Sequence, residues 1–142
     1  MGRMTESNAD LPDDALEFAH RLFDGARTGD AALVTSAIDQ GVPVELTDEK
    51  GNTFLMLASY HGHTGLVAEL IQRGADVNRP NDRGQTPVAG AVFKRHNEIV
   101  SLLLNAGADI NAGIPSARAA ANMFGIDLGQ FMKNDTEPPA DQ

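Results

Sequence analysis

The feature that most constrains this chain is an internal period of 33 residues. The clearest series is Gly41, Gly74 and Gly107, and the five-residue strings that begin at Gly74 and Gly107 differ at one position only. Other residues that recur at this offset are Gly51 and Gly84, Thr53 and Thr86, Ala58 and Ala91, His63 and His96, and Val34, Val67 and Val100. So many matches at one spacing indicate that copies of one small structural unit follow each other along the chain.

The first half of each unit predicts a short helix. Thr53 and Thr86 can cap its start, because a threonine hydroxyl accepts hydrogen bonds from the free amides of the first turn. Pro87 then occupies a first helical position, where a missing amide hydrogen costs no hydrogen bond. The predicted helices cover residues 54–61 and 87–94.

The second half of each unit predicts another helix, which begins near Thr64 or Asn97. Its apolar residues follow the i, i+3, i+4 spacing of one helical face. They are Val67, Leu70 and Ile71 in one unit, and Val100, Leu103 and Leu104 in the next. Gly74 and Gly107 follow these helices, and we expect them to adopt positive φ. A polar loop, 78–84, then leads to the next unit.

Several of these motifs resemble those of the ankyrin repeat. Thr86-Pro87-Val88 resembles the Thr-Pro-Leu helix opening of that family, and Gly62-His63 resembles its Gly-His turn. The strings that end in Asn78 and Asn111 are similar to its Gly-Ala-Asp-Val-Asn. The resemblance covers about residues 14–132. It implies an all-α ankyrin-repeat solenoid in which each unit buries its apolar face against its neighbours.

The resemblance implies one domain, 13–132, with four units: two full repeats between two degenerate caps. Their approximate bounds are 14–46, 47–79, 80–112 and 113–132. Asp13 or Asp14 is the expected cap of the first helix. The strict period fails after Asn111, and an offset of 28 restores it by aligning Pro115 with Pro87 and Ala119 with Ala91. This offset predicts a loop five residues shorter in the last unit.

The same alignment matches Leu128, Phe131 and Met132 to Val100, Leu103 and Leu104. The flanking segments, 1–12 and 133–142, are rich in polar residues and proline, and are predicted to be disordered tails.

Composition narrows the range of partners. The net charge is −9 and no basic stripe is present, which disfavours nucleic acid and anionic membranes as partners. No cysteine is present, so disulfides and thiolate metal sites are excluded. No signal peptide or membrane-spanning run is found. We therefore expect a cytoplasmic monomer whose partner is another protein.

No pattern in the sequence predicts catalysis, a cofactor or a metal ion. No nucleophile elbow or phosphate-binding loop is present. His63 and His96 repeat with the period, so we expect them to bridge the turn between helices. His61 and His63 are two residues apart, so on a helix they would face different directions. The acidic pairs Asp13-Asp14 and Asp48-Glu49 are expected to be solvated. The chain is therefore not expected to be an enzyme.

Two equivalent aromatic residues, Tyr60 and Phe93, are not expected to belong to the core of the repeats. Both fall near the end of the first helix of a unit, and the resemblance implies that partners contact this surface and the loop tips. The expected contact set is Arg27, Thr28, Glu49, Lys50, Asn52, Tyr60, His61, Asp82, Arg83, Gln85, Phe93 and Lys94. We expect both rings to point into one concave groove. The alternative is that they pack only on each other and on a neighbouring loop.

The predicted function is therefore protein binding through the concave face, as an adaptor, regulator or inhibitor. The chain resembles the small stand-alone ankyrin-repeat proteins of bacteria, which implies such an accessory role. The alternative is a self-associating structural protein whose concave face forms a homo-oligomer interface.

Overall fold

The computed structural model describes residues 13–131, and in this range it is built from helices. The elements in chain order are α1 (Asp13–Thr28), α2 (Ala31–Asp39), α3 (Phe54–His61), α4 (Thr64–Gln72), α5 (Pro87–Lys94), α6 (Asn97–Asn105), α7 (Ala117–Phe124) and the 3₁₀ helix η3 (Leu128–Phe131). The predicted tails 1–12 and 133–142, and Met132, lie outside the described residues, as does the side chain of Asp13.

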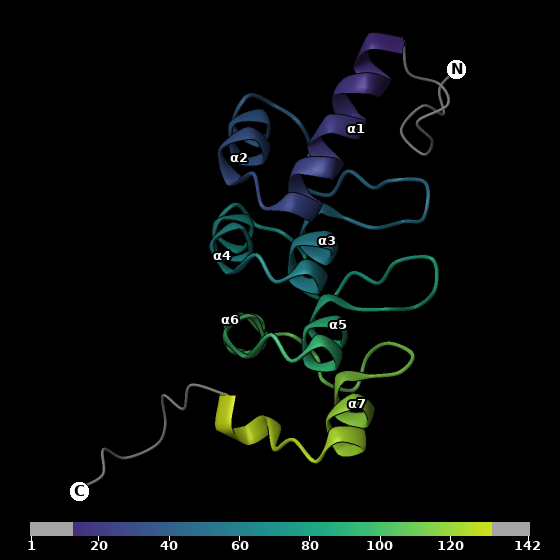
Figure 1. Cartoon of the computed structure of the whole chain (residues 1–142), viewed down its shortest axis with the longest axis vertical. Helices are drawn as coiled ribbons and strands as arrows, with labels where there is room; N and C mark the ends of the chain where they lie inside the picture. Colours follow the sequence, from purple (N-terminus) through teal and green to yellow (C-terminus); the bar gives the residue numbers. More distant parts are fainter. Residues whose placement is uncertain (1–12, 132–142) are drawn as a thin grey trace, which may run out of the picture.

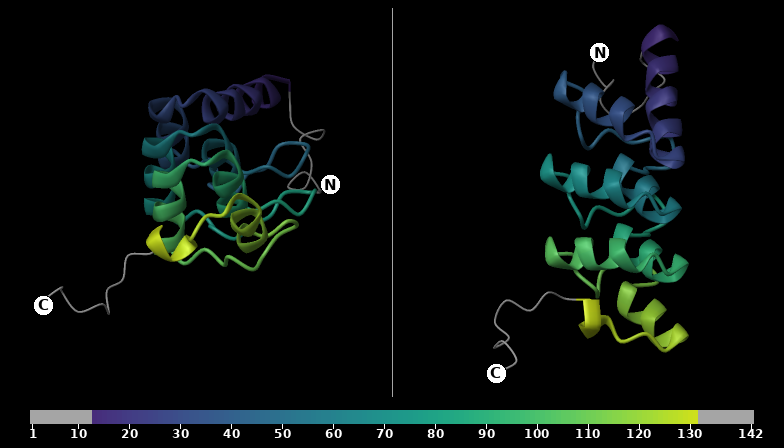
Figure 2. Two further views of the ribbon diagram at one scale, coloured as in Figure 1. Left: turned by 60° about the horizontal axis from the view of Figure 1, so that its bottom comes forward. Right: turned by 60° about the vertical axis from the view of Figure 1, so that its left-hand side comes forward.

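The helices form two columns, from which the loops project at one side (Figure 1). One column contains α1, α3, α5 and α7, and the other contains α2, α4 and α6; Figure 2 shows the same arrangement from two further directions. The loops that precede α3, α5 and α7 extend away from the first column. This is the predicted all-α solenoid of stacked units.

Local capping explains why the central helices begin and end as predicted. The Thr53 hydroxyl accepts a hydrogen bond from the Met56 amide at 3.0 Å, and α3 follows over the predicted residues. Thr86 caps α5 in the same way, with proline at the first helical position. Gly74 and Gly107 follow α4 and α6 with φ of 88° and 98°. Their predicted positive φ is confirmed.

The core lies where the units stack, because no unit can bury its own apolar face. α3 packs against α1 on one side and α5 on the other, and Ala58 and Ala91 are fully buried between the helices. Small side chains at these positions allow the helices to approach closely. The rings of Phe23 and Phe54, 4.8 Å apart, join the first unit to the second.

The two periodic histidines tie each unit to the one before it. His63 Nε2 lies 2.6 Å from the carbonyl oxygen of Arg27, and His96 Nε2 lies 3.1 Å from that of Tyr60. Each of these carbonyls belongs to the last turn of the preceding first helix. The structural role predicted for the histidines is confirmed, and their contact is between units.

α7 and η3 lie where the fourth unit is expected, but the predicted offset of 28 is wrong. The Ser116 hydroxyl caps α7 by accepting a hydrogen bond from the Ala119 amide at 3.1 Å, so Ser116 takes the place of Thr86. From Gly107 to Ser116 the chain advances nine residues, against twelve from Gly74 to Thr86. The offset is therefore 30, and the loop is three residues shorter, not five. Pro115 precedes the cap and does not align with Pro87.

The second helix of this unit is reduced to η3, which packs on α6. The Ser101 hydroxyl fixes it by donating a hydrogen bond to the Phe131 carbonyl at 3.0 Å. A short apolar turn thus covers the end of the second column.

Candidate functional site

The candidate site is a groove on the inner face, which we define as the surface made by α1, α3, α5, α7 and the loops that precede α3, α5 and α7. The groove has a volume of about 550 Å³. It lies between α3 and two successive loops. Its lining residues are Glu49, Lys50, Asn52, Met56, Leu57, Tyr60, His61, Asn81, Asp82, Arg83 and Gln85.

Residues of α3 form the floor of the groove, which includes one aromatic ring. Met56 and Leu57 are almost fully buried, and Tyr60 is half-buried. Gly90 on α5 packs beside this floor: a β-carbon there would lie 3.2 Å from Met56 Cε and 3.4 Å from Tyr60 Cδ1. The Lys94 ammonium lies 5.0 Å from the centre of the Tyr60 ring, within the range of a cation–π interaction. Tyr60 therefore presents part of its ring to the groove while α5 supports it.

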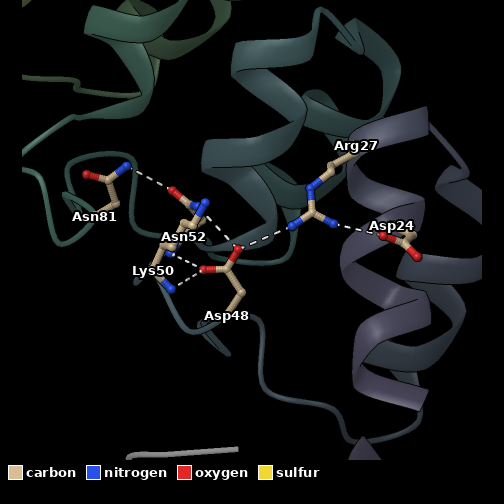
Figure 3. Close-up of polar contacts among 6 residues, drawn as sticks. All are labelled: Asp24, Arg27, Asp48, Lys50, Asn52 and Asn81. Atoms are coloured by element: carbon tan, nitrogen blue, oxygen red, sulfur yellow. Dashed lines mark hydrogen bonds and ion pairs between the residues drawn. The ribbon is translucent and has the colours of Figure 1, made fainter. Parts of the chain in front are cut away.

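The first loop wall is organised by Asp48, which is buried, so the expectation that this carboxylate is solvated is wrong (Figure 3). Its Oδ1 accepts hydrogen bonds from the amides of Lys50 and Asn52, both at 2.9 Å. Its Oδ2 accepts from Asn52 Nδ2 at 3.2 Å, and Arg27 Nη2 lies 3.5 Å away. One carboxylate thus fixes the turn that carries Glu49 and Lys50.

The second loop wall repeats this arrangement with an amide. Asn81 Oδ1 accepts hydrogen bonds from the amides of Arg83 at 2.9 Å and Gln85 at 3.0 Å. The two loops are also joined, because Asn81 Nδ2 donates to Asn52 Oδ1 at 2.9 Å (Figure 3). A backbone bond from the Asp82 amide to the Lys50 carbonyl, 3.0 Å, adds a second link. The walls are therefore held in place before any partner binds, which lowers the entropic cost of binding.

The structure brings together eight of the twelve residues expected to contact a partner. Those that line the groove are Glu49, Lys50, Asn52, Tyr60, His61, Asp82, Arg83 and Gln85. Lys94 lies at its edge, over Tyr60.

Three expected contact residues are engaged elsewhere. Arg27 pairs with Asp24 at 2.8 Å and with Asp48, and the Thr28 hydroxyl donates to the Asp24 carbonyl. Phe93 packs against Phe124, with ring centres 5.6 Å apart. The expectation that Tyr60 and Phe93 share one groove is therefore not met by this groove.

Sequence reasoning missed two groups of inner-face residues. Asn81 falls in the predicted polar loop 78–84 and is not among the expected contact residues, although its side chain lines the groove and joins the loops. Ile114 and Met123 are exposed, at 77% and 65%, in the last unit. With the offset of 30, Met123 occupies the position of Phe93. The signal for it was the serine cap at 116, which sets that offset.

The electrostatics of the groove favour a neutral histidine. Partial burial lowers the pKa of His61 below its ordinary value, and the positive charges of Arg27 and Lys94 and the neighbouring histidines lower it further. Between residues 13 and 131, no cluster of three or more acidic or histidine side chains could hold a metal ion. No helix in the same range is long and apolar enough to cross a membrane.

Comparisons with known proteins place these features in a family. Residues 22–113, more than half of the chain, match the family model described as ankyrin repeats in three copies. A relative from Pseudomonas aeruginosa, named "Putative ankyrin repeat protein PA3287", is 46% identical over 61 residues. That match covers 42% of this chain and 36% of the Pseudomonas protein, so it spans about a third of that relative.

Proposed function

This chain belongs to the ankyrin-repeat family, whose repeats are generic protein–protein interaction modules, and we propose that it binds a client protein through the groove on its inner face. In this role it would act as a cytoplasmic adaptor, regulator or inhibitor. Proteins of this family are typically non-enzymatic, and the proposal requires no cofactor, metal ion or nucleic acid.

The observation that carries the proposal is the organisation of the groove. Its loop walls are fixed by the Asp48 and Asn81 hydrogen bonds, and its floor includes part of the Tyr60 ring. A rigid, partly apolar groove with a half-exposed aromatic ring and polar walls is suited to bind a protein segment, because aromatic anchors in such surroundings supply much of the affinity of interfaces.

A second candidate function is self-association through the inner face of the last two units. Three exposed apolar residues favour it: Phe93 (49% exposed), Ile114 and Met123. Exposed apolar side chains that gather on one face often mark an interface. Under this reading two copies of the chain would cover each other's apolar side chains. Light scattering over a range of concentrations separates this candidate from a monomeric binding protein.

A site-specific photo-crosslinker tests the first proposal. It replaces His61, which is exposed at the groove, or Gln72, which is exposed on α4 in the other column. In cells of the native organism we expect a covalent adduct with one other protein from position 61 and none from position 72. Adducts from position 72 alone would contradict the proposal. An adduct between two copies of the chain would favour self-association.

A further inference from the structure

Arg95 adopts a backbone conformation that the other units assign to glycine. It follows α5 with φ of 63°, whereas the equivalent positions are Gly29, Gly62 and Gly125, with φ of 89°, 87° and 70°. A residue with a β-carbon is strained in this left-handed region. Within residues 13–131, Arg95 is the one non-glycine residue with positive φ. Strain at a single position is a reason to look for a function of the side chain.

Arg95 and its neighbour Lys94 each lie over an aromatic ring of an adjacent unit. Lys94 Nζ is 5.0 Å from the centre of the Tyr60 ring, and Arg95 Cζ is 4.7 Å from that of Phe124. The two residues are consecutive at the end of α5, and the rings that their side chains reach belong to the units before and after it. Both side chains are exposed.

Among residues 13–131, no carboxylate neutralises either cation. Over residues 13–131, the arginines that form ion pairs are Arg27, Arg73 and Arg79, and no acidic side chain pairs with Lys94 or Arg95. The partial negative charge at a helix end accounts for one cation in the last turn of α5, which is Lys94. It does not account for an arginine at the strained position that follows.

From this arrangement we propose that Lys94 and Arg95 bind a carboxylate-bearing segment of the partner protein. The proposal rests on the proposed function and specifies the chemistry of the partner. The chain has a net charge of −9, so its overall charge repels an acidic segment. Lys94 over the Tyr60 ring and Arg95 over the Phe124 ring are both exposed and form no ion pair within residues 13–131, so they can attract it where α5 ends. An apolar side chain of the partner would enter the groove, and an adjacent aspartate or glutamate would reach Lys94 and Arg95.

The test uses short random peptides displayed on phage and selected on the full chain. Peptides that lose binding when Tyr60 is replaced by alanine are the inner-face binders, and these are sequenced and synthesised. Their affinities are measured for Arg95→Gly and for Arg21→Gln. Arg21→Gln is the matched control, because Arg21 is an exposed arginine that lies 5.5 Å from the Phe18 ring at the other end of the stack.

We expect the inner-face peptides to be enriched in aspartate and glutamate. Arg95→Gly should weaken their binding about fivefold, the size of one well-placed exposed charge pair, and Arg21→Gln should leave it unchanged. The melting temperature of Arg95→Gly should be equal or higher, because glycine adopts positive φ without strain. A purely structural role for Arg95 would predict a lower melting temperature.

Inner-face peptides without acidic enrichment, or with equal affinity for Arg95→Gly, would overturn this inference and leave the proposed function in place. If no selected peptide depends on Tyr60, the proposed function fails, and the inference fails with it. Dimerisation of the purified chain that depends on Arg95 would assign the two cations to a second copy and would also overturn the inference.

Discussion

Two alanine substitutions, Gly29→Ala and Gly74→Ala, measure how strongly the histidine contacts hold the stack together. The two glycines have the same backbone conformation, with φ of 89° and 88°. A β-carbon at Gly74 would meet no atom within 4 Å, whereas one at Gly29 would lie 2.6 Å from His63 Nδ1. The pair therefore separates backbone strain from the loss of the contact between units.

The expected losses of unfolding free energy follow from this geometry. Gly74→Ala should cost about 1 kcal/mol, the strain of alanine in the left-handed region. Gly29→Ala should cost the same backbone strain and, in addition, about 1–3 kcal/mol for overpacking against the His63 ring. Displacing that ring from the Arg27 carbonyl costs about 1 kcal/mol more. The total is about 3–5 kcal/mol, against about 1 kcal/mol at Gly74.

Equilibrium unfolding in urea gives both values. As a control, Gly29→Ala is repeated in a His63→Ala background. The clash is absent there, so Gly29→Ala should cost only the backbone strain, about 1 kcal/mol. Equal losses at Gly29 and Gly74, or strict additivity with His63→Ala, would refute the role assigned to the histidine.

Three further predictions concern the inner face, the last unit and pH. Phe93→Ala should lower the unfolding free energy by less than about 1 kcal/mol, because the Phe93 side chain is exposed, and Tyr60→Ala should lower it by about 1–2 kcal/mol, because the Tyr60 ring is partly buried. Losses of several kcal/mol in urea unfolding would make these rings part of the core. Deletion of residues 114–142 should expose Leu103 and Leu104 and cause aggregation, visible by size-exclusion chromatography; a soluble product of unchanged stability would show that the last unit is not a cap. The melting temperature should fall as the pH is lowered from about 7.5 to about 5. His61 has its ordinary pKa in the unfolded chain and a lower pKa in the native state, so the unfolded chain binds more protons in this range. The decrease should be smaller in His61→Gln, and an equal decrease would assign the effect to other groups.

The central helices could be predicted from the sequence because their ends are set locally. The hydroxyls of Thr53 and Thr86 bind amides three residues away. Gly74 and Gly107 each come one residue after the C-caps of α4 and α6, Arg73 and Ala106. Such signals act within one helical turn, so their recurrence in the sequence predicts where each helix begins and ends. The prediction of stacked units followed from the apolar faces that these helices carry.

The last unit and Phe93 show where sequence reasoning fell short. Pro115 looked like the equivalent of Pro87, but the hydroxyl of Ser116 determines where α7 begins. The wrong offset placed Phe124 at the position of His96 and concealed its contact with Phe93. The groove itself depends on residues far apart in the sequence, such as Asn52 and Asn81, whose side chains join its two loop walls. No local pattern encodes that juxtaposition.

The affinity of the crosslinked partner, measured by calorimetry beside the melting temperature of each variant, tests the central claim most directly. The claim is that the groove on α3 is the binding surface. Tyr60→Ala should weaken binding at least about 30-fold, the effect of losing an anchor residue, while the protein remains folded. Gln72→Ala, on the other column of helices, should bind as tightly as the unmodified chain. Unchanged affinity for Tyr60→Ala together with lost affinity for Gln72→Ala would contradict the claim.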